Sequence, residues 1–193
     1  MKKIIFILLL FVSLSAHADE KGEARLANIS RHYSAMGNYS VSFVLRVGGA
    51  EQRGVMLVNG NNSYLKVADT EVFIVGDLRY EVRGSAKEII VDKTDVYEKE
   101  LLNSLNNFSH IAADYTIEEC EVEGRVAVRL TPKKQGETMY VVTGADGASV
   151  AKLRYGAGEN LVEIRVEKSE KSSQALPVFN KEQYKGFELI DFR

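Results

Sequence analysis

The sequence is poor in the side chains that cross-link a fold or hold a metal. It contains one cysteine and three histidines among 193 residues. The lone Cys120 excludes an internal disulfide, so stability has to come from the burial of apolar side chains. Because Cys120 stands in the strand-like stretch EECEVEG, we expect a small buried side chain there rather than a nucleophile. His32 and His110 fit no spacing such as H-E-x-x-H, and we therefore expect no metal site.

Motifs of catalysis and cofactor binding are also absent from the sequence. There is no G-x-S-x-G elbow and no P-loop, and the glycines mark turns instead of clustering into a phosphate cradle. Carboxylates alternate with apolar residues, as in LVEIRVEK at 161–168, which is typical of a solvated sheet face. We expect a protein that is not an enzyme and that needs no cofactor.

Neither sign of charge dominates. Lysine and arginine number 25 against 27 aspartates and glutamates, and the formal net charge is −2. The basic residues are scattered singly and form no stripe along a strand or helix, so no nucleic-acid partner is expected. The chain has two prolines and no low-complexity linker, which predicts one domain over residues 19–193.

The one long apolar run is too short to span a bilayer. Lys2 and Lys3 precede the apolar residues 4–12, and the small-residue site Ala16-His17-Ala18 follows. This order is typical of a secretory signal, which predicts cleavage after Ala18 and export to the periplasm. No cysteine follows the cleavage site, so we expect no lipid anchor there.

Two segments show helical spacing. The apolar residues Leu26, Ile29, Tyr33 and Met36 recur every three or four positions, and Gly37 supplies a stop signal. A second helix is expected over 97–109, where four apolar side chains share one face: Leu101, Leu102, Leu105 and Phe108.

Elsewhere the apolar period is two. Residues 39–47, YSVSFVLRV, alternate apolar and polar positions, and similar short runs recur about every 8 to 12 residues between turn signals. This rhythm predicts a mainly β fold with about eleven antiparallel strands. The last run, residues 186–193, changes phase between Leu189 and Ile190, which predicts a paired strand with a bulge or with both faces buried.

Three segments resemble the divergent, LolA-like form of the outer-membrane lipoprotein carrier family. They are RGVMLVNGNNSYLKV at 53–67, VGDLRYEV at 75–82 and the closing FNKEQYKGFELIDFR at 179–193. The resemblance covers nearly all of the chain after the signal. The family's basic-proline pair and tryptophan are missing, since NGNN stands at 59–62 and the chain has no tryptophan, so the family's lid latch is not carried over.

The resemblance implies a curved, half-open antiparallel β-barrel of about eleven strands, with short helices as a lid over an apolar cavity. It implies a periplasmic carrier that binds the acyl chains of lipoproteins and delivers them to the outer membrane. The partners it implies are acylated lipoproteins, an inner-membrane release complex and an outer-membrane acceptor, and we expect a monomer. The residues expected to contact lipid are Leu26, Ile29, Tyr33, Met36, Phe43, Leu45, Leu57, Leu101, Leu102, Leu105 and Phe108.

Three other interpretations remain open at this stage. The apolar faces could pack against one another as an ordinary core without any cavity. The same scaffold could serve as a periplasmic lipid-binding sensor or regulatory domain, of the kind that resembles the sigma-E regulatory protein. An exported hydrolase is a third alternative.

Overall fold

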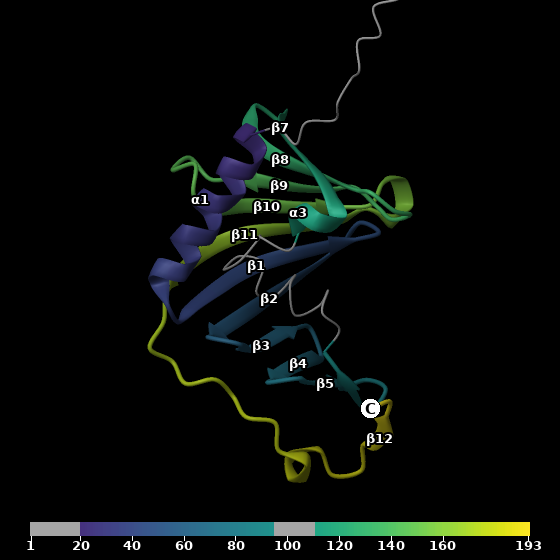
Figure 1. Ribbon diagram of the computed structural model, residues 1–193. Coiled ribbons are helices and arrows are strands. Elements are labelled where there is room, and N and C mark those ends of the chain that lie inside the picture. Colours follow the sequence, from purple (N-terminus) through teal and green to yellow (C-terminus); the bar gives the residue numbers. More distant parts are fainter. Residues whose placement is uncertain (1–19, 95–110) are drawn as a thin grey trace, which may run out of the picture.

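The computed structural model describes residues 20–94 and 111–193, which form one curved, unclosed sheet and one long helix (Figure 1). The helices are α1 (Glu20–Met36), the short α3 (Ile111–Asp114) and the 3₁₀ turns η1 (Gly158–Asn160) and η2 (Lys181–Tyr184). The strands are β1 (Tyr39–Val47), β2 (Ala50–Asn59), β3 (Asn62–Val67), β4 (Thr70–Val75), β5 (Leu78–Arg83), β6 (Glu88–Lys93), β7 (Tyr115–Val122), β8 (Arg125–Pro132), β9 (Met139–Thr143), β10 (Val150–Tyr155), β11 (Val162–Lys171) and β12 (Glu188–Asp191).

The expected mainly β, half-open barrel is confirmed, with twelve strands in one sheet where about eleven were predicted. Their order is β12-β6-β5-β4-β3-β2-β1-β11-β10-β9-β8-β7, so the sheet has two free edges and does not close. Neighbouring strands are antiparallel except that β12 pairs in parallel with β6. That pair corrects the expectation of an antiparallel sheet throughout.

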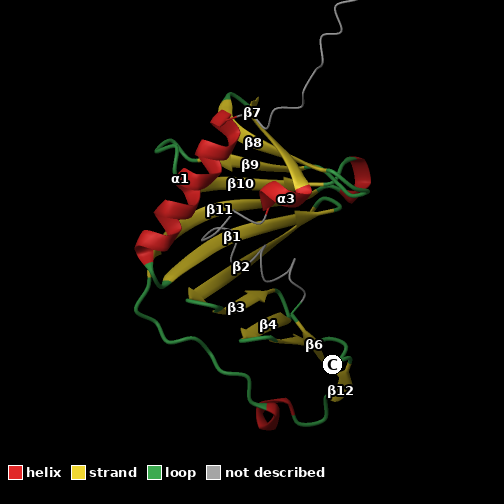
Figure 2. Cartoon of the chain, viewed as in Figure 1, coloured by secondary structure: helices red, strands yellow, loops and turns green. Residues whose placement is uncertain are grey.

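Bulges contribute to the curvature of the sheet. The pairing of β1 with β11 shifts by one residue between Ser42 and Phe43, and that of β10 with β9 shifts between Val150 and Lys152. An extra residue in one strand bends it and increases the local twist. Both irregularities belong to the group of strands that curls around α1 (Figure 2).

Helix α1 forms as its periodicity predicts and packs on the concave face of the sheet. Acidic residues occupy its first turn, which suits the helix dipole. It ends at Gly37, whose φ of 68° lies in the left-handed region that glycine adopts most easily. Gly22 lets the helix approach β7 closely, because a Cβ there would lie 3.0 Å from the backbone carbon of Glu118.

The two halves of the sheet are covered on opposite faces. In the half made of β1 and β7–β11, which we call the helix half, the concave face packs against α1. Its core includes Leu26, Ile29, Tyr33, Tyr39, Val41, Phe43, Ile117, Val128, Leu130 and Val141. Since side chains alternate along a strand, the opposite face of these strands carries Glu118, Arg129 and similar charged residues.

In the other half, β2–β6 and β12, a second apolar cluster covers the convex face, and β2 adds Met56 and Val58 to the α1 core on the concave face. We call this the strap half, because the irregular segment 172–187, the strap, runs along its outside (Figure 1). The buried residues beneath the strap are Leu57, Tyr64, Phe73, Val82, Ile89 and Val91. The strap contributes four partly buried apolar side chains to this second core: Leu176, Phe179, Tyr184 and Phe187.

The C-terminal segment pairs as predicted but is not buried as predicted. Residues Glu188–Asp191 form β12 at the edge of the sheet, in unbroken register with Glu88–Val91 of β6. The predicted bulge or two-sided burial is wrong, since the register does not shift and Leu189 and Phe192 are 40% and 65% exposed. The phase change instead sends Phe187 to the convex core, and Ile190, paired with Ile90, to the concave face.

Two further expectations concern single features. Cys120 is only partly buried, which corrects the prediction of a buried side chain; it lies on the convex face opposite Ala127. The helix predicted over 97–109 lies outside the described residues. No helix within the described ranges is long and apolar enough to cross a membrane.

Candidate functional site

The concave face carries a group of apolar side chains that are only partly buried. Six of them, which we call the concave wall, pack beside the α1 core: Leu45, Leu65, Val67, Leu153, Ile164 and Val166. They come from strands β1, β3, β10 and β11. Cross-strand pairing places Leu153 beside Ile164 and Ile164 beside Leu45, so the wall continues from strand to strand. An apolar surface that is only partly buried inside a curved sheet is suited to an apolar ligand.

Next to the concave wall, the aromatic ring of Phe43 packs over Gly54. These residues pair across β1 and β2, and the Phe43 ring occupies the space that a side chain at 54 would need. A Cβ on Gly54 would lie 2.4 Å from Cζ of Phe43. The ring therefore lies down over the neighbouring strand, and Phe43 itself is only 5% exposed.

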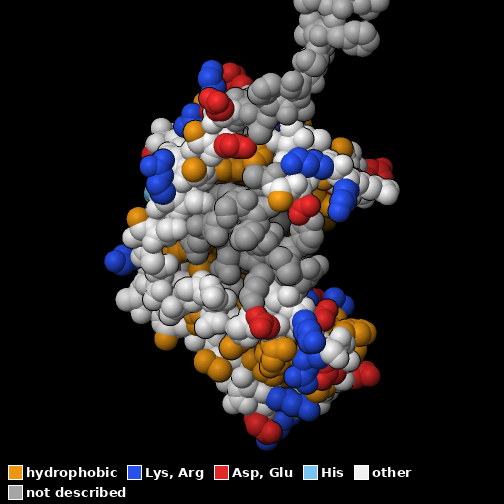
Figure 3. All heavy atoms as spheres, in the orientation of Figure 1, with side chains coloured by type: hydrophobic (Ala, Val, Ile, Leu, Met, Phe, Trp, Pro, Cys, Tyr) orange, Lys and Arg blue, Asp and Glu red, His pale blue; other side chains and the backbone are white. Residues whose placement is uncertain are grey.

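The concave face turns polar at β5. Arg79, Glu81 and Arg83 share the concave side of this strand, opposite to Tyr80, and Glu81 pairs with both arginines. The Nε of Arg83 donates to Oε1 of Glu81 over 2.5 Å. Burial alone would raise the pKa of Glu81, but the hydrogen bonds from Arg83 and Arg79 outweigh it, and that pKa is lowered. The wall therefore ends at an ionised ladder, and charged side chains are visible at this end of the molecule in Figure 3.

Polar contacts fasten α1 over the sheet. The guanidinium of Arg25 donates to Oε2 of Glu119 on β7, from Nη2 over 3.0 Å and from Nε over 3.2 Å. The carbonyl of Gly147 accepts from Asn28 over 3.1 Å, and from Arg25 over 3.4 Å. Farther along the helix, the Tyr33 hydroxyl accepts from the Val150 amide over 3.4 Å. Helix α1 is thus tied to both β7 and the β9–β10 turn.

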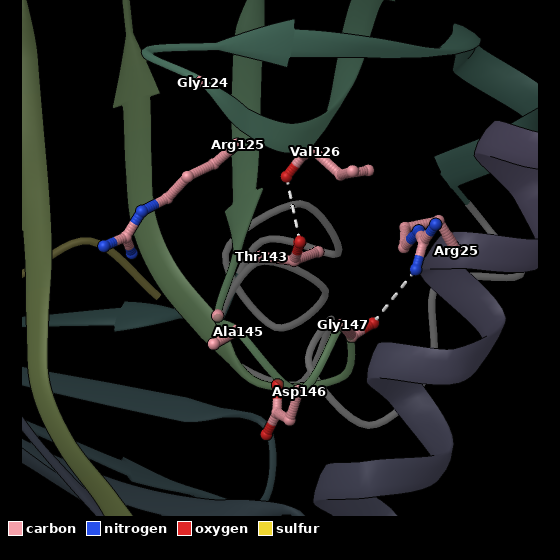
Figure 4. Close-up of a pocket in the computed structure, with 9 residues that line it drawn as sticks. Arg25, Gly124, Arg125, Val126, Thr143, Ala145, Asp146 and Gly147 are labelled. Carbon is pink, nitrogen blue, oxygen red and sulfur yellow. Dashed lines mark hydrogen bonds between the residues drawn. The ribbon is translucent and has the colours of Figure 1, made fainter.

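A pocket of about 450 Å³ lies beside this fastening (Figure 4). Arg25, Val126 and Thr143 line it together with the glycine-rich turns at 124 and 144–147. Its polar groups are largely engaged, because Thr143 donates to the Val126 carbonyl and Arg25 is bound to Glu119. In the figure the Arg125 side chain points away from the pocket. A second pocket of about 500 Å³ lies between the Gly48-Gly49 turn and η1.

Ten of the eleven residues predicted to contact lipid separate into three groups. Leu26, Ile29, Tyr33 and Phe43 are at most 5% exposed and form the core between α1 and the sheet. Met36 and Leu45 are partly buried on the same side. Leu101, Leu102, Leu105 and Phe108 lie outside the described residues. For all of these, lipid contact stays a prediction.

The predicted location of the Leu57 side chain is wrong. It was grouped with Phe43 and Leu45, yet its side chain points to the convex face and is buried in the core beneath the strap. Its strand neighbours Met56 and Val58 are the ones that face α1. Leu57 therefore shares no pocket with Phe43 and Leu45.

Sequence reasoning missed most of the concave wall. Leu65, Leu153 and Ile164 stand in strands that were predicted, at positions of the right parity, so the alternation contained the signal. Which parity faces inward depends on cross-strand pairing, and that information is not local. Among the described residues, no group of three or more His, Cys, Asp or Glu side chains is placed to hold a metal ion.

Comparisons with known proteins give a likeness in fold. No model of a known protein family matches the chain, and no curated protein sequence matches it. Among solved structures, an uncharacterized conserved protein from Thermus thermophilus is similar with a TM-score of 0.59 at 10% identity, over 89% of this chain and 99% of that one. At that identity the similarity concerns the fold alone.

Two further structures are similar at lower scores. In the MucA/MucB complex of Pseudomonas aeruginosa, the match has a TM-score of 0.45 at 19% identity, over 86% of this chain and 60% of that one. The Mycobacterium tuberculosis lipoprotein LppX matches with a TM-score of 0.43 at 12% identity, over 79% of this chain and 98% of that one. Scores in this range say nothing about what the present chain binds.

Proposed function

We propose that this chain is an exported carrier that shields the acyl chains of lipoproteins on the concave face of its sheet and delivers them to the outer membrane. The proposal joins the LolA-like resemblance of three sequence segments to a mainly β, half-open sheet. The signal-like N-terminus supports export to the periplasm. The release complex and acceptor that such a carrier needs at the two membranes remain part of the proposal.

The observation that carries this proposal is the concave wall. Its six side chains belong to four strands and are partly exposed, although other residues on the same concave face, such as Val128 and Val141, are fully buried under α1. The strap covers the convex face and leaves the concave face of β3 and β4 to other contacts. An apolar surface kept on the inside of a curved sheet fits a ligand without polar groups along its length.

The energetics favour shielding of this kind. Each CH₂ group removed from water contributes about 0.8 kcal/mol, so an acyl chain in water is strongly driven toward any apolar surface that can cover it. A carrier therefore needs no catalytic group and no strong polar contact along the chain. What it needs is apolar area with enough freedom to release the ligand again.

Two measurements test the proposal. Native mass spectrometry of the protein isolated from its own periplasm should show a co-purifying acylated species. Titration with 11-dansylaminoundecanoic acid should give a saturable rise and blue shift of the dansyl fluorescence. A protein that carries no acylated species and binds no dansyl probe would overturn the proposal. A lipid that co-purifies but never exchanges would instead favour the sensor or regulatory interpretation.

A further inference from the structure

Within residues 20–94 and 111–193, no helix packs on the concave face of β4–β6 as α1 does on that of the helix half. On the concave side of β4, Ile74 is buried at 2% exposed. Helix α1 contacts β7 and β8 and packs on the concave core, whereas the apolar cluster to which β4, β5 and β6 contribute lies on the convex side. The partner on that side is the strap. The shape of the strap half therefore depends on a segment that lies outside the concave face.

Aromatic stacking attaches the strap to β4 and β5. The ring of Phe179 lies parallel to that of Tyr80 with centroids 4.3 Å apart, and it meets Phe73 edge-on at 5.8 Å. On the other side, Tyr184 stacks on Phe179 at 6.0 Å. Phe179 thus stands between a ring of the sheet and a ring of the strap itself.

A hydrogen bond strengthens this attachment. The Tyr184 hydroxyl donates to Oε2 of Glu71 on β4 over 3.1 Å. Burial, together with the nearby Glu71 carboxylate, raises the pKa of Tyr184 to about 12, so the hydroxyl keeps its proton at neutral pH. The contact fixes η2 against β4, one of the two strands that hold Phe179.

The strap also joins distant parts of the sheet. It leaves β11, which pairs with β1 near the middle of the strand order, and it ends in β12 at the far edge beyond β6. Between β11 and β12 lie seven strand spacings, roughly 33 Å, whereas residues 172–187 fully extended would span roughly 55 Å. Because the segment has this slack, its length does not limit the curvature, and its side-chain attachments have to do so.

We propose that the strap is a clamp that fixes the curvature of the strap half, and with it the width of the concave face, by holding Phe179 between Tyr80 and Tyr184. The four attached side chains are only partly buried, and residues 172–180 have no regular secondary structure. Segments with few buried contacts open locally at low cost. Release of the clamp would free β4–β6 and β12 to change their angle to β1 without unfolding the helix half.

The consequence for binding rests on the proposed function. If the concave wall holds acyl chains, a change in curvature moves Leu65 and Val67 of β3 relative to Ile164 and Val166 of β11. The clamp then controls affinity from the opposite face of the sheet, although no strap residue belongs to the concave wall.

The test measures curvature directly, with paired spin labels in a Cys120→Ser background. One label replaces Ala86 in the exposed β5–β6 turn, and the other replaces the exposed Arg125 at the start of β8. Phe179→Ala should broaden the distribution of distances between the labels. The matched control is Val178→Ala, because Val178 is the neighbouring strap residue and is 75% exposed, so this variant should keep the wild-type distribution. A folded Phe179→Ala protein with a wild-type distribution would overturn the proposal.

A milder variant covers the case in which Phe179→Ala does not fold. Tyr184→Phe keeps both rings and removes only the hydrogen bond to Glu71, and it should broaden the distribution to a lesser degree. An unchanged distribution in that variant would equally overturn the clamp.

Titration with 11-dansylaminoundecanoic acid separates the two proposals. A higher Kd in Phe179→Ala than in Val178→Ala supports the link to binding, and equal values contradict it. If no variant and no wild-type protein binds the probe, the carrier proposal fails, while the label distances still decide the clamp.

Discussion

The ring of Phe43 on β1 covers Gly54 on β2, its direct cross-strand partner. An aromatic side chain and a glycine facing each other are complementary in shape, since the ring fills the space that the glycine leaves empty. The Lys66 carbonyl lies on the other side, 3.0 Å from where a Cβ on Gly54 would be. Position 54 therefore requires glycine, because any side chain there would collide with the Phe43 ring.

Gly54→Ala should destabilise the protein by displacing the ring. The added methyl group forces Phe43 out of its position, and overpacking of this kind costs about 1–3 kcal/mol. Urea denaturation measures the change in the free energy of unfolding. In a Phe43→Leu background the same alanine should cost much less, because the two residues are coupled. Equal costs in both backgrounds would show that the ring is not the obstacle.

Tyr39→Phe should leave stability unchanged or raise it by up to about 1 kcal/mol. Tyr39 is fully buried, its ring packs against Tyr33 with centroids 5.1 Å apart, and its hydroxyl has no hydrogen-bond partner among the described residues. Removing the hydroxyl removes an uncompensated polar group and keeps the ring. Thermal unfolding checks this, with Tyr33→Phe as the matched control. Because the Tyr33 hydroxyl accepts from Val150, that control should lose stability. A clear loss in Tyr39→Phe would contradict the assignment.

Protonation of Glu81 on β5 at low pH should lower the free energy of unfolding, and Glu81→Gln should lack this contribution to the pH dependence. The folded-state pKa of Glu81 is lowered from its ordinary value of 4.5 by Arg83 and Arg79. A lowered folded pKa contributes stability that is present above the unfolded pKa and is lost as pH falls through the folded pKa. Urea midpoints of the wild type and Glu81→Gln should therefore converge as pH falls from about 7 to below about 4. A constant difference between them would disprove the effect.

The concave wall and the convex core should respond differently to truncation. Leu65→Ala together with Ile164→Ala should weaken binding of 11-dansylaminoundecanoic acid about tenfold, given about 0.8 kcal/mol for each CH₂ group that stays in water. Leu57→Ala should cost about 2–5 kcal/mol of stability because that side chain is fully buried. Leu57→Ala leaves the wall itself intact, so any weaker binding should follow the melting temperature. If Leu57→Ala weakened binding as much as the Leu65→Ala and Ile164→Ala double variant, Leu57 would belong to the same binding surface as those two residues.

Export should remove residues 1–18. The intact mass of the periplasmic protein should correspond to a chain that begins at Asp19 and carries no acyl group. Replacing Ala18 with a bulky residue such as leucine should block cleavage, whereas the same change at His17 should have little effect, because small side chains are needed at both alanines of A-x-A. A mature mass that retains these residues would refute the signal assignment.

Periodicity was sufficient for the helix and for the strands. The spacing of Leu26, Ile29 and Tyr33 predicts α1, and the alternation from Tyr39 to Val47 predicts β1, because both patterns are local. Pairing between strands is not local. The register that sends Leu57 outward and Leu65 toward the concave wall arises from contacts between strands, and the parallel pairing of β12 arises from the path of the strap.

The strap itself could not be predicted from the sequence for a related reason. Residues 172–180 show neither helical nor strand spacing, so nothing local marks them as structural. Their role comes from rings that lie about a hundred positions away along the chain, such as Tyr80 for Phe179. Likewise, the phase change at Ile190 was visible, but its cause is the division of Phe187 and Ile190 between two faces.

The strand order has a consequence for how the chain folds when its N-terminal part becomes available first. β1 is the first strand to emerge, yet its second neighbour is β11, through pairs such as Tyr39 with Lys171. The meander β1–β6 can form early from local hairpins, but it then has an unpaired edge at β1 and an uncovered aromatic face at Tyr64 and Phe73. Both are completed by residues of β11 and the strap, and pairing over such sequence separations is slow. Until β11 and the strap are in place, the nascent meander therefore keeps an exposed strand edge and an exposed aromatic face, which makes it prone to aggregate.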